Sequence, residues 1–219
     1  MKIGPLFFLL LFLIGCSPAA PASTPELLNV YVTSGAYPQL DELYQCASPS
    51  LAVRLSDPAA ADLTVRIGEP QNLSTPAFQI SIEDILVVVH PQVGIGSLTI
   101  EQAHALFLGQ VSNWKELGGN DLPVEVWTFA PDEDVEEIFT RAVMNGQPVT
   151  SGARLAVSAQ AMSDEVGTQP GAVGLLPRRW KAGNTRQALV AASAPVLAIT
   201  SSEPIGAVRE LLGCLQSNP

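Results

Sequence analysis

The sequence predicts an α/β fold with mostly parallel sheets, and three observations support this prediction. Short β-branched and apolar runs alternate along the chain with stretches of helical period. The run ILVVVH (85–90) is continuously apolar up to its histidine, as expected of a strand covered on both faces. TIEQAHALFLG (99–109) begins with Thr99 and has Gln102 three residues later, which is capping-box spacing at a helix start. Strands that alternate with helices are typical of parallel sheets.

The expected strands and helices run from residue 28 to residue 216. LNVYVT (28–33) alternates apolar and polar residues and predicts a strand, and Pro38 suits the first turn of a helix that continues through Tyr44. Further strands are expected at 51–55, 63–67, 85–90, 124–129, 154–158, 171–176 and 196–200. Further helices are expected at 99–109, 134–144 and 204–216.

The N-terminus is expected to direct export. MKIGPLFFLLLFLIGC has one positive residue and an apolar run shorter than the roughly 20 residues of a spanning helix. Its end resembles the bacterial lipobox, so residues 1–15 are expected to be a lipoprotein signal peptide and Cys16 the lipidation site. The alternative is an ordinary secretory signal with an incidental cysteine. Residues 16–27 are rich in Pro, Ala and Ser and predict a flexible tether. The protein is therefore expected to be extracytoplasmic and lipid-anchored to the bacterial membrane.

Composition limits the kinds of partner. With 219 residues, 47% of them hydrophobic, the chain can bury a core as one domain or two small lobes. The formal net charge is −10, and removal of residues 1–15 takes away Lys2 and no acid, which gives −11. Such a balance argues against nucleic acid as a partner and leaves membrane contact to the lipid anchor.

Two cysteines, Cys46 and Cys214, remain after export. Outside the cytoplasm an even pair is a candidate disulfide, which would tie the two ends of the chain together. Two separately buried thiols are the alternative.

Motifs for catalysis and cofactors are incomplete. Gly94-Ile95-Gly96 lacks the third glycine and the later acid of a dinucleotide fingerprint. His90 and His104 are the two histidines and have no metal-ligand spacing, and no G-x-S-x-G motif occurs. We expect no catalytic residue, no metal and no cofactor, and therefore no enzyme.

The segment from Ile85 to Leu176 resembles the second lobe of the phosphate-binding proteins of ABC transporters. The matching stretches are ILVVVHP, SLTIEQAHALFLGQVSNWKELGGNDLPVEVW, FTRAVMNGQPVTSGARL and TQPGAVGLLP. This PstS-like branch belongs to the type II periplasmic binding proteins. The resemblance implies two lobes joined by a hinge, a small solute in the cleft, an ABC permease as partner, and a monomer. The expected lobes are 28–84 with 181–219, and 85–180.

The resemblance also implies where a solute binds. The family's first ligand turn follows the first strand, where this chain has Thr33, Ser34, Gly35 and Ala36. Hydroxyl and backbone N–H donors at a helix start would suit an oxyanion.

The second ligand run of the family, Ser-Gly-Thr-Arg before a helix, is replaced here. Its place in APDEDVEEIF holds Asp132, Glu133, Asp134 and Val135. Two unit charges about 6 Å apart at an effective dielectric of about 20 repel by roughly 3 kcal/mol, so these carboxylates disfavour phosphate. The cluster either starts a helix and fills its own anion site, with Asp134 and Glu137 at cap-box spacing, or contacts a cationic or metal-bearing solute.

The first lobe departs from the family as well, and its cleft is expected to be reduced. The stretch between Cys46 and Ser81 is short and lacks the family's Gly-Ser-Gly segment. Positive charge could be restored by three arginines, if they face the cleft: Arg66, Arg178 and Arg179.

Two functions follow from the sequence. The first is a solute-binding protein of the phosphate-transporter type whose solute need not be phosphate. The second is a ligand-free lipoprotein that keeps the binding-protein fold as an interaction or sensory module.

Overall fold

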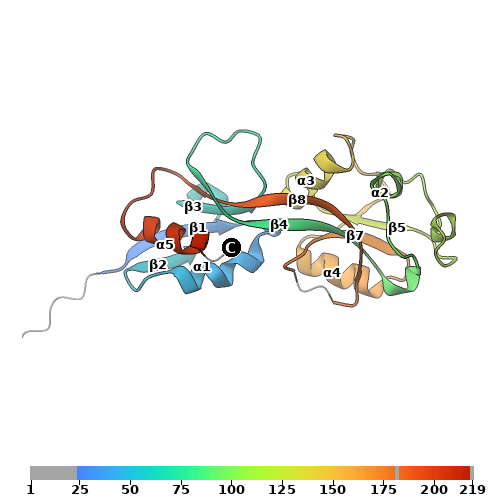
Figure 1. Cartoon of the computed structure of the whole chain (residues 1–219), viewed down its shortest axis with the longest axis horizontal. Coiled ribbons are helices and arrows are strands. Elements are labelled where there is room, and N and C mark those ends of the chain that lie inside the picture. The colour runs from blue at the N-terminus through green and yellow to red at the C-terminus, as the bar shows by residue number, and fades with distance from the viewer. Residues whose placement is uncertain (1–23, 181–182, 218–219) are drawn as a thin grey trace, which may run out of the picture.

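In the computed structural model, which describes residues 24–180 and 183–217, the chain forms an elongated molecule with two lobes (Figure 1). The long strands β4 (Ala77–Val89) and β8 (Arg186–Thr200) pair antiparallel and run through both lobes. Within the described residues, eight strands form one sheet in the order β2-β1-β3-β8-β4-β7-β5-β6. The predicted two-lobed α/β class is confirmed.

The first lobe lies at one end of β4 and β8. It contains β1 (Glu26–Val32), β2 (Leu51–Leu55) and β3 (Leu63–Ile67), together with helices α1 (Leu40–Cys46) and α5 (Gly206–Ser217), which pack on each other. Pro38 lies in a short 3₁₀ turn before α1, where its fixed φ and missing N–H are tolerated. β1 begins two residues earlier than the expected position 28.

The second lobe lies at the other end. Its strands are β5 (Glu125–Thr128), β6 (Arg154–Leu155) and β7 (Ala172–Pro177). Its helices are α2 (Ile100–Phe107), α3 (Asp134–Ala142) and α4 (Ala159–Thr168). Further 3₁₀ turns lie at Pro58–Ala60, Pro91–Val93 and Trp114–Leu117.

Two local predictions for the second lobe had different outcomes. The capping box of α2 is confirmed, because Thr99 accepts a hydrogen bond from the N–H of Gln102 and the Gln102 side chain accepts one from the N–H of Thr99. The strand expected at 154–158 is only two residues long, and α4 follows it without having been predicted. Ser158 caps α4 by accepting from the N–H of Ala161 at 3.1 Å. The small residues of AQAMSDEVGT give this helix a weak apolar periodicity, so its sequence signal was faint.

The centre of the sheet is antiparallel. Of the seven strand pairings among the described residues, the four that join β1 to β2 and β3, and β5 to β6 and β7, are parallel. β8 pairs antiparallel with β3 and β4, and β4 pairs antiparallel with β7. Both β4 and β8 begin earlier than the runs 85–90 and 196–200. The added part of β4 alternates apolar with polar residues, and the added part of β8 is rich in alanine, so neither has a continuous run of β-branched residues.

The two crossing strands form the connection between the lobes. Residues 186–192 of β8 lie beside 85–89 of β4, and Ser193 pairs with Asp84. The pairing register shifts at three places along β4, which marks β-bulges. Bulges bend a strand and increase its twist, so they suit strands that change lobes. Ile85 to Val89 are all buried, as predicted for a strand covered on both faces.

Some predictions fall outside the described residues. The signal peptide, the lipidation site Cys16 and the tether up to residue 23 all lie in the part of the chain that the structure does not describe.

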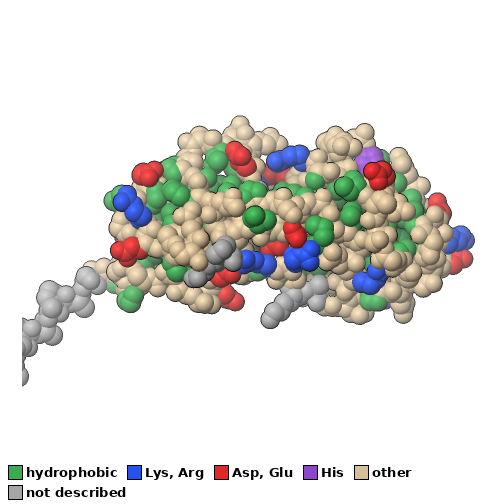
Figure 2. Space-filling view, viewed as in Figure 1, with side chains coloured by type: hydrophobic (Ala, Val, Ile, Leu, Met, Phe, Trp, Pro, Cys, Tyr) green, Lys and Arg blue, Asp and Glu red, His purple; other side chains and the backbone are tan. Residues whose placement is uncertain are grey.

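On the face shown in Figure 2, acidic and basic side chains are interspersed among small groups of hydrophobic side chains.

Candidate functional site

The turn Thr33–Ala36, here called the anion turn, leads from β1 into the first helix. The N–H of Thr33 donates to the carbonyl of Val65 at 3.0 Å, and the N–H of Ala36 donates to the carbonyl of Thr33 at 3.1 Å. Thr33 and Ser34 are half-buried, whereas Gly35 and Ala36 are buried. The backbone bonds tie the turn to β3 and fix the direction of its hydroxyl groups.

The acidic run Asp132–Asp134 lies between the end of β5 and the start of α3. Its three members have different surroundings, because Asp132 is exposed, Glu133 is half-buried and Asp134 is only 1% exposed. Glu133 occupies the N-cap position of α3 without a side-chain capping bond. Asp134 is the member of this run that hydrogen-bonds to residues of the first lobe.

Asp134 joins the two predicted ligand segments. Its Oδ2 accepts a hydrogen bond from Thr33 Oγ1 at 2.5 Å and another from the N–H of Ile67 at 2.8 Å. Its Oδ1 accepts from the N–H of Val135, also at 2.8 Å. A second-lobe carboxylate thus accepts hydrogen bonds from a hydroxyl group and a backbone N–H of the first lobe.

The contact between the anion turn and α3 is tight. A Cβ atom added to Gly35 would lie 2.8 Å from Asp134 Oδ1 and 2.7 Å from Val135 Cγ2, both below normal contact distance. Because an atom of that size does not fit, a separate anion cannot lie between Gly35 and Asp134 in this arrangement.

The buried position changes the acidity of this run. Burial raises the pKa of Asp134, while the hydrogen bonds from Thr33 and Ile67 and the charge of Arg66 act in the opposite direction. Burial also raises the pKa of Glu133, and the neighbouring charges of Asp134 and Asp132 raise it further. Additional negative charge at this place is therefore disfavoured.

The three arginines named from the sequence are all engaged in ion pairs. Arg66 Nη2 lies 2.7 Å from Glu137 Oε2, and this pair also crosses between the lobes. Arg178 pairs with Asp84 at 2.8 Å. Arg179 Nη1 lies 2.6 Å from Glu42, and its Nε lies 3.9 Å from the buried Glu83. Each of these positive charges is balanced by an acidic partner, so the three arginines do not form an anion site in this arrangement.

Sequence reasoning missed part of this contact. The Asp134–Glu137 capping box is wrong, because Asp134 bonds to the first lobe and Glu137 pairs with Arg66. The N–H of Ala159, at the start of α4, donates to Ser34 Oγ at 3.3 Å. Backbone donors such as Ile67 leave no side-chain signal, although the Ser158 cap could have indicated α4.

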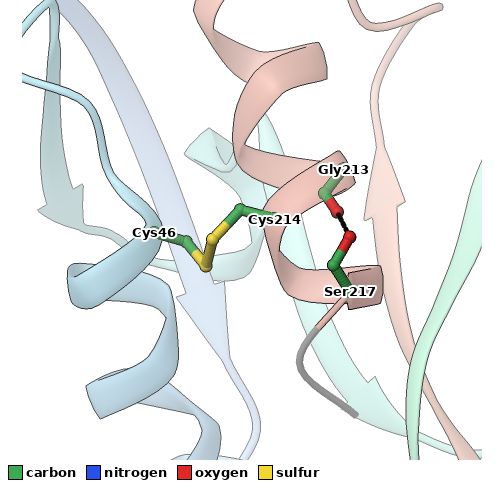
Figure 3. The surroundings of a disulfide bond; sticks show 4 residues. All are labelled: Cys46, Gly213, Cys214 and Ser217. Carbon is green, nitrogen blue, oxygen red and sulfur yellow. Dashed lines mark hydrogen bonds between the residues drawn. A yellow bond between two sulfur atoms is a disulfide. The ribbon is translucent and has the colours of Figure 1, made fainter.

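The cysteines Cys46 and Cys214 form a disulfide bond that joins α1 to α5 (Figure 3). Their Cα atoms are 5.6 Å apart, and 168 positions separate them in the sequence. Ser217, one turn later on α5, donates a hydrogen bond to the carbonyl of Gly213 at 2.7 Å. The bridge lies within the first lobe and links its two chain segments.

Among the described residues, no group of three or more His, Cys, Asp or Glu side chains is arranged to hold a metal ion. Nor does any helix in residues 24–180 or 183–217 have the length and apolar character needed to cross a membrane.

A family model described as a PBP superfamily domain matches residues 56–207, which is more than half of the chain. The chain belongs to the PBP superfamily. The phosphate-binding protein PstS of Bacillus subtilis (strain 168) is 24% identical over 98 residues, which cover 45% of this chain and 32% of that protein. The chain thus aligns with about one third of this curated relative, and the PstS-like resemblance is confirmed.

Solved structures show the same PBP fold. A putative phosphate ABC transporter substrate-binding protein from Clostridium perfringens with bound phosphate has a TM-score of 0.77 at 14% identity, over 87% of this chain and 93% of that chain. A phosphate transport receptor from Vibrio cholerae has a TM-score of 0.66 at 19% identity, over 86% and 93% of the two chains. The regulatory domain of an OxyR2 variant from Vibrio vulnificus has 0.64 at 12% identity, over 89% and 98%. At these identities the likeness concerns the fold, which transport and regulatory proteins share.

Proposed function

We propose that this PBP-superfamily chain is an extracytoplasmic, lipid-anchored solute-binding protein of the phosphate-transporter type. It is proposed to work as a monomer with an ABC permease and to catalyse no reaction. The PstS relative and the two phosphate-transporter neighbours support the transport role. We place the boundary at which the chain enters the second lobe at residue 85, as expected from the sequence. Because residues 186–192 pair with 85–89, we propose that the chain returns to the first lobe near Ser193.

The solute of this protein is proposed to be something other than inorganic phosphate. One observation carries this proposal, namely the hydrogen bonds from Thr33 and Ile67 to Asp134. A phosphate ion would have to displace a carboxylate that already holds these donors, and it would then lie beside that carboxylate's negative charge. At about 6 Å and an effective dielectric of about 20, each pair of unit charges repels by roughly 3 kcal/mol.

The test is phosphate binding by the wild-type protein and by Asp134→Ser, measured as thermal stabilisation. The wild type is expected to show no saturable stabilisation by millimolar phosphate, whereas Asp134→Ser should gain it, because a hydroxyl replaces the competing carboxylate. Asp132→Ser is the matched control, since it removes an exposed acid two residues away. Stabilisation of the wild type approaching about 2.7 kcal/mol, the value for ligand at about 100 times its dissociation constant, would refute this proposal.

The lipid anchor has its own test. The wild type should incorporate a radiolabelled fatty acid and Cys16→Ser should not, because the thiol that would carry the diacylglycerol is gone. A wild-type protein without label, or a variant that is labelled equally, would contradict the anchoring proposal and leave the solute-binding role unaffected.

A second candidate function is a ligand-free interaction or sensory module. The interlobe bonds of Asp134 and the Arg66–Glu137 pair favour it, because both hold the lobes together without a solute. This function predicts no stabilisation by anions, amino acids, polyamines or divalent metals, and no change in small-angle scattering when they are added. A saturable response to any of them would exclude it.

A further inference from the structure

A cavity of about 830 Å³ opens on the second lobe, beside α3 and outside the contact between Asp134 and the anion turn. One wall is the face of α3 that carries Glu136 and Thr140, and another is the end of β5 with Thr128 and Phe129. The segment 145–155 forms the remaining wall, and Gln71 reaches in from the connection between β3 and β4. Its volume falls within the range of about 300–1,000 Å³ that is usual for small-molecule sites.

The chain creates this cavity by turning sharply after α3. Asn145 and Gly146 both have left-handed backbones, with φ of 53° and 78°. This conformation ends the helical path and directs the next residues away from α3. The segment then returns to the sheet at β6, and the space between it and α3 stays open.

Glu136 lies in the wall of the cavity as a buried carboxyl group without an ion-pair partner among the described residues. It is only 5% exposed, and its carboxylate accepts hydrogen bonds from the hydroxyls of Thr128 and Thr140. Among the ion pairs of the described residues, none includes Glu136. Acidic side chains are rarely this buried without a counter-ion, because the ionised form loses its hydration. Burial accordingly raises the pKa of Glu136, against the effect of its hydrogen bonds.

The other charges around the cavity do not neutralise Glu136. Glu137 also lines it and is paired with Arg66. Arg141 lies on the exposed side of α3, where water screens its charge. The rest of the wall is largely apolar or hydroxyl-bearing, and it includes Phe129, Val149 and the 60%-exposed Leu155.

We propose that this cavity binds a small organic amine, with its ammonium group at the Glu136 carboxylate and its apolar part against Phe129, Val149 and Leu155. The ammonium group supplies the counter-ion that the buried carboxylate lacks. The apolar part covers Leu155, which is exposed to water, and Val149, which is half-buried, and it packs against the edge of the buried Phe129. The site does not use the anion turn, so it stands apart from the proposal about phosphate.

The experiment is calorimetric titration of the intact protein with phenethylamine at neutral pH. 2-Phenylethanol and phenylacetate are the matched controls, because they keep the aromatic body and replace the cation by a neutral group or an anion. Saturable binding of the amine, with both controls weaker by at least about tenfold, is expected. Absence of saturable amine binding, or equal binding of the three compounds, would overturn the proposal.

Variants assign the binding to this cavity. Glu136→Gln should weaken amine binding by at least about tenfold, and Asp132→Asn, which changes an exposed acid near the same helix, should leave it within about twofold. Leu155→Arg places a positive charge in the cavity wall at an exposed position and should also weaken binding. It provides a test if Glu136→Gln does not fold. Undiminished binding in the folded variants would refute the site. Asp134→Ser should retain amine binding, so failure of this proposal and failure of the phosphate proposal can be told apart.

Discussion

Asp134 and Glu136 are two residues apart on α3, and both are buried carboxyl groups, yet their surroundings differ. Asp134 points across the lobe boundary and is held by Thr33 and Ile67 of the first lobe. Glu136 stays within the second lobe, where its hydroxyl partners Thr128 and Thr140 lie along an open cavity. The difference teaches that a buried acid does not by itself mark a ligand site, because its neighbours can already satisfy it.

Asp134 is held by a first lobe whose two chain segments are joined by the Cys46–Cys214 disulfide, and removal of this bond should have the largest effect. Replacing both Cys46 and Cys214 by Ser should lower the free energy of unfolding by about 2–5 kcal/mol, because the bridge closes a long loop in the unfolded chain. Urea unfolding of the oxidised wild type and the variant measures this loss. An unchanged midpoint would show that the two ends are held by packing alone.

The next test compares the two carboxyls directly. Asp134→Ala should cost about 1–3 kcal/mol, because it leaves the hydroxyl of Thr33 and the N–H of Ile67 without their acceptor at a buried contact. Glu136→Ala should cost less, about 1 kcal/mol, since the space left by the side chain opens to the cavity and lets water reach Thr128, Thr140 and the N–H of Phe129. Equal losses in urea unfolding would break the distinction between the two places.

The pH dependence of stability should show both groups with the same sign. The pKa of Asp134 is raised above its usual 3.8, and that of Glu136 above 4.5, so the folded state holds these protons more strongly than the unfolded state. Their contributions are complete below the usual values and are lost as the pH rises through the raised values. Unfolding measured between pH 4 and pH 8 should therefore change less with pH in Asp134→Asn and in Glu136→Gln than in the wild type. A steeper profile in either variant would contradict the direction.

The smallest effect concerns the ion pair beside Asp134. Arg66 and Glu137 are partly exposed, with 15% and 25% of their side-chain surfaces accessible, so their coupling should be at most about 1 kcal/mol. A double-mutant cycle with Arg66→Gln and Glu137→Gln measures it. Coupling well above this value would mean that the pair, and not Asp134 alone, holds the lobes together.

The sequence determined much of this protein through local signals. Period-two and continuous apolar runs located β1, β2 and β3 and the apolar half of β4, and the Thr99–Gln102 spacing located the start of α2. These predictions needed no knowledge of the tertiary structure, because each depends on residues that are neighbours in the chain. The PstS-like stretches added the two-lobed architecture and directed attention to Thr33–Ala36 and to Asp132–Asp134.

Only the tertiary structure decided what the acidic run does. Asp132, Glu133 and Asp134 are chemically similar in sequence, but the position of α3 brings the Asp134 carboxyl into hydrogen bonds with the first lobe. Its partners are a hydroxyl about one hundred positions away and a backbone N–H, neither of which has a local sequence signal. The cavity beside Glu136 likewise depends on how far the segment 145–155 turns from α3. Contacts between distant parts of the chain are set by the packing of whole elements, so local residue patterns cannot determine them.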